Sequence, residues 1–187
     1  MNARLLTLTI GLFLLSACQA MTGISHRYPE SWPELIRTAS SQCTDISGTY
    51  VEKGVCNYPL HCNSLSLFNR LASTEAQPID QSTVTVKQLS PDQIEVSLSN
   101  KDGMATKQLS SKSEDFVCED GAVWIKQGED FHAEGVGVAS RKYIMGFKKA
   151  SDGSLIGQHR NTGWGLVMWV VPIGGTQILW YKWSTSN

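Results

Sequence analysis

The sequence lacks most of the short patterns that mark enzymes and nucleic-acid-binding proteins. It contains no His-Glu-x-x-His pair, no Gly-x-Ser-x-Gly segment and no glycine-rich phosphate loop that opens a helix. Charged residues make up only 18% of the chain, and 17 acidic residues outnumber 16 basic ones. Without a basic excess there is no electrostatic footprint for nucleic acid. These absences weigh against an enzyme built on a familiar motif and against a nucleic-acid partner.

Metal-ligand spacings are also missing. The closest cysteines stand as Cys-x5-Cys, wider than the Cys-x2–4-Cys pairs of structural zinc sites, so we expect no metal and no cofactor. The one cluster that an enzyme could use is His132 and Glu134 with the nearby Asp130. It keeps a second function class open, a hydrolase acting on envelope lipid or glycan.

The N-terminus has the features of an export signal. Arg4 supplies a positive charge, and Leu5–Leu15 is apolar but too short to span a bilayer as a helix. The segment Leu15-Ser16-Ala17-Cys18 resembles the lipobox of bacterial lipoproteins. The resemblance implies cleavage before Cys18, a diacylglycerol on its sulfur and acylation of the new amino terminus. Several acyl chains at one residue give stable anchoring. An ordinary secretory signal that happens to precede a cysteine is the alternative.

The same resemblance predicts the location of the protein. Gln19 follows the cysteine where inner-membrane retention signals carry aspartate, which implies sorting to the outer membrane, on its periplasmic face. We expect residues 1–17 to be a signal peptide and residues 18–31 a polar, lipidated tether. Residues 32–187 form a single β-rich globular domain in this interpretation. The mature chain then has 170 residues and loses only Arg4 among its charges.

Four cysteines remain beside the lipidated one, and an even count in an exported chain predicts two disulfides. Three pairings are possible. We favour Cys56–Cys62, which closes a small loop, together with Cys43–Cys118, which joins distant segments.

The fold class is predicted to be mainly β. Val84 and Val86 alternate with polar residues, as do Ile94, Val96 and Leu98, which is typical of a hairpin with one buried face. Asp-Gly pairs at positions 102, 120 and 152 favour tight antiparallel turns. We expect an antiparallel meander of about nine strands, as a barrel or strongly curved sheet. Two short helices should cover it, one over residues 31–39 and one starting near Ser64.

The C-terminal stretch is the most apolar region of the mature chain. We interpret it as two buried strands, Gly165–Val171 and Gln177–Trp183, around a turn at Pro172–Gly175. Rings on both faces of these strands cannot all enter one core, so some could line a pocket or interface. The binding candidates are Trp164, Trp169, Trp180, Tyr181 and Trp183.

One further pattern bears on the fold and the ligand. Gly48-Thr49-Tyr50 is similar to the Gly-x-Trp opening of lipocalins, with tyrosine in place of tryptophan. It adds weight to a barrel. The sequence thus predicts a non-enzymatic lipoprotein held to the membrane by its lipid anchor, whose β domain binds another envelope protein or an apolar small molecule.

Overall fold

The structure is a computed structural model of the whole chain, and it describes residues 26–40, 42–58, 65–73, 82–101, 103–134, 137–168 and 170–186. Within these ranges the chain is almost entirely antiparallel β-structure with one short α-helix. The first sheet has the strand order β1-β3-β4-β5 and the second the order β2-β10-β9-β8-β7-β6. The elements are β1 (Gly48–Val51), β2 (Val55–Cys56), α2 (Leu67–Ala72), β3 (Thr83–Ser90), β4 (Gln93–Asn100), β5 (Gly103–Ser110), the 3₁₀ turn η2 (Ser111–Ser113), β6 (Phe116–Glu119), β7 (Ala122–Glu134), β8 (Gly137–Lys149), β9 (Leu155–Val167) and β10 (Val171–Trp183).

The first sheet follows from the period-two pattern in the sequence. Val84 and Val86 of β3 and Ile94 and Val96 of β4 are fully buried, and their neighbours along each strand face solvent or the sheet rim. Pairs such as Val86 and Val96 stand directly opposite each other across the two strands. Alternation therefore puts one apolar face toward the second sheet.

Two of the Asp-Gly pairs form the predicted turns. Asp120 and Gly121 both take positive φ angles, 53° and 67°, where β6 turns into β7. Gly153 has φ 84° in the turn between β8 and β9. At Gly121 a Cβ would also come within 2.9 Å of the Thr38 carbonyl oxygen. Both the positive φ angle and this close approach therefore favour glycine at position 121. Asp102 lies outside the described residues.

The two sheets pack over one hydrophobic core. Trp183, Tyr50, Phe116 and Phe147 are its largest fully buried side chains, and α2 adds Leu67, Phe68 and Leu71 at its side. Helix α2 begins at Ser66, whose hydroxyl accepts a hydrogen bond from the Asn69 amide. The expected second helix is thus present, although its cap is Ser66 and the expected cap, Ser64, lies outside the described residues.

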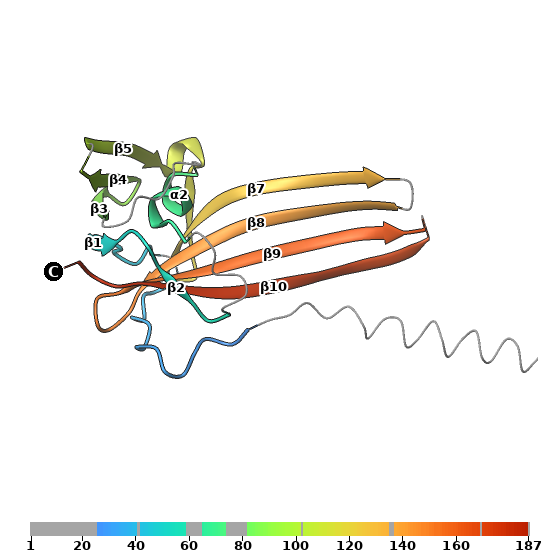
Figure 1. Cartoon of the computed structure of the whole chain (residues 1–187), viewed down its shortest axis with the longest axis horizontal. Coiled ribbons are helices and arrows are strands. Elements are labelled where there is room, and N and C mark those ends of the chain that lie inside the picture. Colours follow the sequence, from blue (N-terminus) through green and yellow to red (C-terminus); the bar gives the residue numbers. More distant parts are fainter. Residues whose placement is uncertain are drawn as a thin grey trace, which may run out of the picture.

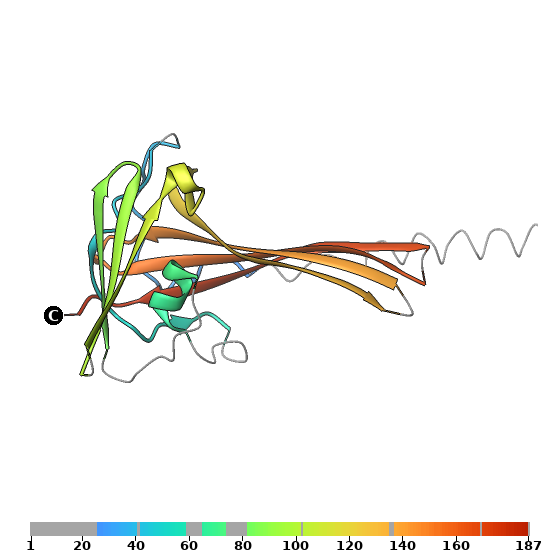
Figure 2. The ribbon, with the colours of Figure 1, turned by 90° about the horizontal axis from the view of Figure 1, so that it is seen from above.

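The second sheet is much longer than the first. Strands β7 to β10 have 13 residues each, which corresponds to about 43 Å of extended chain. Their basal halves cover the core, whereas their outer halves project beyond the body as a four-stranded ribbon (Figure 1). Seen from above, neither face of this ribbon is covered by another described element (Figure 2). We call the projecting part, residues 128–134, 137–143, 161–168 and 170–177, the arm.

Several expectations about the fold are corrected. In the described part of the chain the strands form two separate sheets and no closed barrel, and they number ten instead of about nine. The expected helix over residues 31–39 is absent. Its backbone bonds to the β8–β9 turn instead: the Ile36 amide donates to the Lys149 carbonyl and the Ser151 amide to the Glu34 carbonyl. These sheet-like bonds satisfy groups that a helix would have used internally.

The expected turn at Pro172–Gly175 is also wrong. These residues lie inside β10 and pair in register with residues 163–166 of β9, and the last pair before the chain reverses is Val167 with Val171. Proline is tolerated because β10 is an edge strand at this point: β2 pairs only with Tyr181 and Lys182.

A disulfide joins Cys43 to Cys118, the pairing favoured from the sequence. It ties the segment before β1 to β6 across 75 residues of chain. Cys56 is also disulfide-bonded, and its favoured partner, Cys62, lies outside the described residues. Among the described helices, none has the length and apolar content needed to cross a membrane.

Candidate functional site

The arm tip is an exposed apolar surface. We define it as residues 131–134, 137–140, 164–168 and 170–174, the outermost rows of β7 to β10. Five of its large hydrophobic side chains are exposed, with exposed fractions from 39% to 75%. They are Phe131, Trp164, Met168, Val170 and Val171.

Strand register places these side chains together. Phe131 stands opposite Ser140 of β8, which stands opposite Trp164 of β9, so the two rings share one face of the ribbon. Val138 and Leu166 occupy the next row outward on this face, also opposite each other. Met168 and Val170 belong to the turn that ends the arm. The apolar groups thus wrap around the end of the ribbon instead of forming the single buried stripe of an ordinary strand.

The charge distribution along the arm is equally uneven. Glu134 is the one Asp, Glu, Lys or Arg in the arm tip, and the sequence from Asn161 to Tyr181 contains none. Immediately behind the tip, Asp130 stands opposite Arg141 and Glu129 opposite Lys142. On β7 and β8, two acidic and two basic residues therefore stand between the apolar tip and the body, with one oppositely charged pair on each face of the ribbon.

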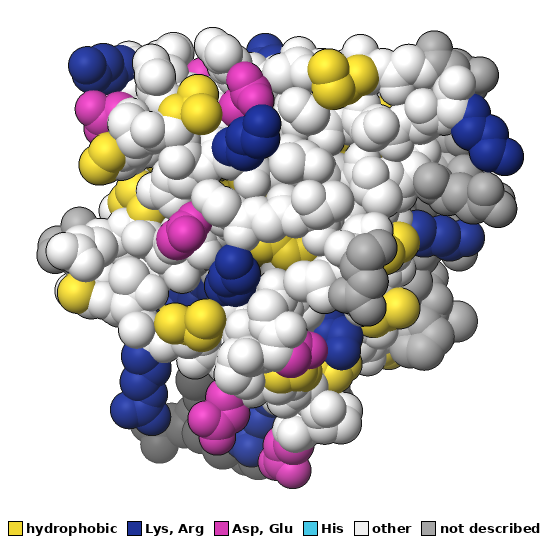
Figure 3. Space-filling view, turned by 90° about the vertical axis from the view of Figure 1, so that its left-hand side faces the viewer, with side chains coloured by type: hydrophobic (Ala, Val, Ile, Leu, Met, Phe, Trp, Pro, Cys, Tyr) yellow, Lys and Arg dark blue, Asp and Glu magenta, His cyan; other side chains and the backbone are white. Residues whose placement is uncertain are grey.

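The opposite end of the molecule looks different. Figure 3 faces the end of the body that lies away from the arm tip, and acidic, basic and hydrophobic side chains are interspersed there. Exposed hydrophobic residues on the body, such as Met104 and Val117, stand singly, which is normal for a protein surface. A group of exposed apolar side chains at one end of a protein more often marks an interaction site.

The N-terminal segment packs on the base of the arm. The His26 amide donates to the Ile178 carbonyl, and the Trp180 indole N–H donates to the His26 carbonyl at 2.9 Å. The rings of Tyr28 and Trp180 meet edge to face with centroids 5.2 Å apart. Farther along, Lys182 Nζ lies 5.9 Å from the Trp32 ring centroid. Residues 26–31, assigned to the tether from the sequence, therefore lie along β10.

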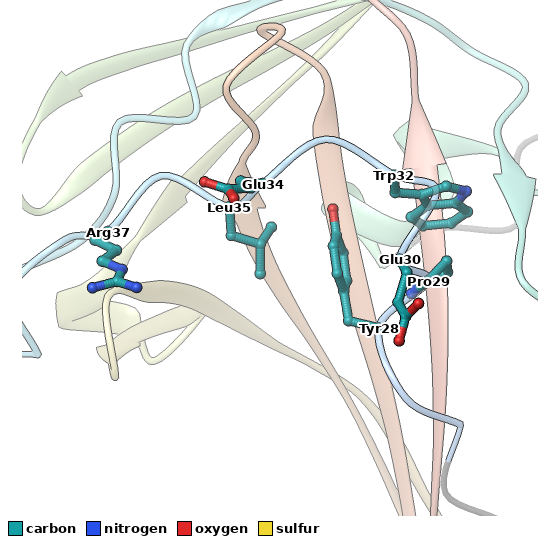
Figure 4. Close-up of a pocket in the computed structure, with 7 residues that line it drawn as sticks. All are labelled: Tyr28, Pro29, Glu30, Trp32, Glu34, Leu35 and Arg37. Carbon is teal, nitrogen blue, oxygen red and sulfur yellow. The ribbon is translucent and has the colours of Figure 1, made fainter.

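This segment itself lines an open groove of about 460 Å³. In Figure 4 the ring of Tyr28 stands in the groove, with Trp32 to one side and Leu35 to the other. The Tyr28 hydroxyl donates to the Pro33 carbonyl, and burial together with the nearby Asp152 raises its pKa. The Tyr28 hydroxyl is already bonded within the segment. The groove is therefore formed by the way the N-terminal segment folds on itself.

A polar cluster lies on the core-facing side of the sheet where the arm begins. His159 stacks on Tyr143 with ring centroids 6.1 Å apart and lies beside Tyr181. Burial and then the charge of Arg70 lower the pKa of His159 to about 4. His159 Nδ1 and Asn161 Oδ1 are buried and make no hydrogen bond with any described residue. The imidazole is held neutral here at physiological pH.

The five aromatic binding candidates are divided by the structure. Trp164 is exposed on the arm, and Trp169 lies outside the described residues. Trp180 is half-buried under the N-terminal segment. Tyr181 and Trp183 are buried in the core, where the Trp183 indole N–H donates to the Leu65 carbonyl. The expected pair of strands buried on both faces is therefore wrong for their outer halves. Cys18, the predicted lipidation site, lies outside the described residues.

The residues weighed for an enzyme do not converge. Asp130, His132 and Glu134 occupy alternate positions of one strand, so they follow each other along it at about 6.7 Å intervals. Asp130 and His132 are exposed. Among the described residues, no group of three or more His, Cys, Asp and Glu could hold a metal ion.

Sequence reasoning missed Phe131, Met168 and Val170 as surface residues. The sequence does contain a signal for two of them, the absence of charged residues from Asn161 to Tyr181. The same apolar stretch also predicts buried strands, so it does not distinguish surface from core. Comparisons with known proteins add no relative: no family model, no curated protein and no solved structure matches the chain.

Proposed function

We propose that this protein is a non-enzymatic envelope lipoprotein, anchored through Cys18 at the periplasmic face of the outer membrane, whose arm binds an apolar partner. The observation that carries the proposal is the arm tip, where Phe131, Trp164, Met168 and Val170 are each more than half exposed. Leaving such side chains in water forgoes the roughly 1.5–3 kcal/mol that burial of each would contribute. A surface that covers them would recover part of this free energy.

The partner classes expected from the sequence were an envelope protein and an apolar small molecule. Core side chains of both sheets pack together between them, from Val84 and Val96 on one side to Phe147 and Trp183 on the other. Binding at an external surface agrees better with this packing than a lipocalin-like interior site. The hydrolase alternative loses support because its candidate residues, Asp130, His132 and Glu134, follow one another along the single strand β7.

Site-specific photo-cross-linking in intact cells tests the proposal. A photoreactive amino acid at position 164, on the arm, should yield cross-linked products. The matched control is position 104 on β5, where Met104 is 74% exposed but stands on the body. Equal cross-linking at both positions, or none at 164, would contradict a binding role for the arm.

A further inference from the structure

The N-terminal segment has a defined direction relative to the arm. His26 bonds to Ile178, Trp32 lies near Lys182, and Glu34 bonds to Ser151 in the turn at the base of the sheet. The segment thus runs parallel to β10, from the base of the arm toward the body. Read backward from Trp32 to His26, the described segment runs along β10 in the direction of the arm tip.

The distances allow the lipid anchor to reach the level of the arm tip. Val171 lies seven residues from Ile178 along β10, which is about 23 Å of strand. Eight residues, 18–25, connect Cys18 to His26, and a chain of this length reaches at most about 28 Å. Acyl chains on Cys18 therefore hold the bilayer surface within about 28 Å of His26.

From these observations we infer that the arm tip docks on the lipid bilayer to which the protein is anchored, with Phe131, Trp164, Met168 and Val170 entering the boundary between headgroups and acyl chains. The inference rests on the proposed anchor at Cys18. It commits the apolar partner of the arm to lipid, and makes the protein a two-point membrane binder.

The arrangement of residues along the arm fits this occupant. The tip is about four rows deep, or about 10 Å along the strands, which matches the 5–10 Å to which interfacial elements enter a bilayer. Trp164 is of the residue type enriched at membrane interfaces. Behind the tip, Arg141 and Lys142 would stand at headgroup level, where their side chains can reach phosphates. Asp130 and Glu129 balance them, so docking should depend little on anionic lipid.

Attachment at two points has a consequence for the body. An acyl anchor at one residue does not by itself fix the orientation of the domain, whereas a docked arm fixes the ribbon against the bilayer. The body, with β1 to β5, then stands away from the membrane at the far end of the arm (Figure 1). The acidic and basic side chains of Figure 3 would face the aqueous compartment.

The test uses the full, acylated chain in phosphatidylcholine–phosphatidylethanolamine vesicles. Val170→Cys adds a thiol at a residue that is 75% exposed, so folding should be unaffected, and the thiol takes an environment-sensitive fluorophore. Ser151→Cys, in the exposed turn at the other end of β8, is the matched control. We expect a blue shift and quenching by spin-labelled lipid for the probe at 170 and neither for the probe at 151.

The outcomes separate the two proposals. If mass spectrometry shows an acylated Cys18 but the probe at 170 stays unquenched by lipid, bilayer docking is overturned while the anchor stands. A probe that is blue-shifted without lipid quenching would also overturn it, because a protein or a second copy then covers the tip. A mature chain without acyl groups on Cys18 would contradict both the lipid anchor and the docking of the arm tip that rests on it. Adding anionic lipid should leave the quenching of the probe at position 170 unchanged, and adding Trp164→Glu to the Val170→Cys chain should reduce this quenching.

Discussion

Two tryptophans 19 residues apart should respond very differently to truncation. Trp183 is fully buried, with its ring 6.0 Å from the centroids of both Phe147 and Tyr181. The sheet is built around it: a Cβ at Gly157 would lie 2.7 Å from the indole ring and one at Gly54 2.5 Å from its nitrogen. No collapse of these neighbours can fill the space without moving backbone.

The magnitude follows from that packing. Trp183→Ala should cost about 3–5 kcal/mol of unfolding free energy through lost burial and the remaining cavity. A further cost of about 1 kcal/mol comes from the Leu65 carbonyl, which loses the indole N–H as its donor. This is a large share of the 5–15 kcal/mol typical of a domain. Trp164→Ala, on the open face of the arm, should cost about 1 kcal/mol or less, the scale of a cross-strand pair.

Equilibrium urea unfolding of the mature chain, followed by far-UV circular dichroism with disulfides intact, measures both values. A Trp183→Ala variant as stable as the parent protein would refute the assignment of the core. A Trp164→Ala variant destabilised as strongly as Trp183→Ala would show that the arm is a packed part of the fold and not a free surface.

Three other perturbations follow from the structure. Replacing Cys43 and Cys118 together by serine should lower the unfolding free energy by about 4 kcal/mol, because the bridge closes a loop of 75 residues, and paired denaturation curves measure this. The pKa of His159 is about 4 in the folded chain against an ordinary value near 6.5, so the unfolded chain binds more protons between these pH values. Stability should therefore fall as pH drops from about 6.5 to 4, by up to about 3 kcal/mol, and His159→Gln should flatten this part of the stability–pH profile. Finally, Cys18→Ser should abolish incorporation of labelled fatty acid, and a mature N-terminus at any residue other than Cys18 would contradict the lipobox interpretation.

The sequence predicts the buried face of the β3–β4 hairpin and the Asp120-Gly121 turn, because both depend on residues close together in the chain. The alternation at Val84, Val86, Ile94 and Val96 places a buried face without reference to the rest of the chain. The Asp120-Gly121 turn follows from the backbone conformations those residues accept. The Cys43–Cys118 pairing was favoured among three possibilities by loop size alone.

Other features depend on tertiary contacts that no local pattern contains. Ser31 and Glu34 have capping-box spacing, yet sheet-like bonds to the β8–β9 turn replace the helix. Pro172 is typical of turns, but it lies within a strand because that edge of β10 has no partner strand. Trp164 and Trp183 are the same residue type in one apolar stretch, and only the length of the ribbon beyond the core decides which is exposed.

In the proposed arrangement, the arm and the lipid anchor act together at one membrane. The sharpest test of this arrangement is the accessibility of a thiol at position 170 to a membrane-impermeant maleimide in spheroplasts with a permeabilised outer membrane. In the Val170→Cys chain with Cys18 intact, labelling should be strongly reduced relative to Ser151→Cys, and combining Val170→Cys with Cys18→Ser should restore it. Equal labelling of positions 170 and 151 in the anchored protein would contradict the account.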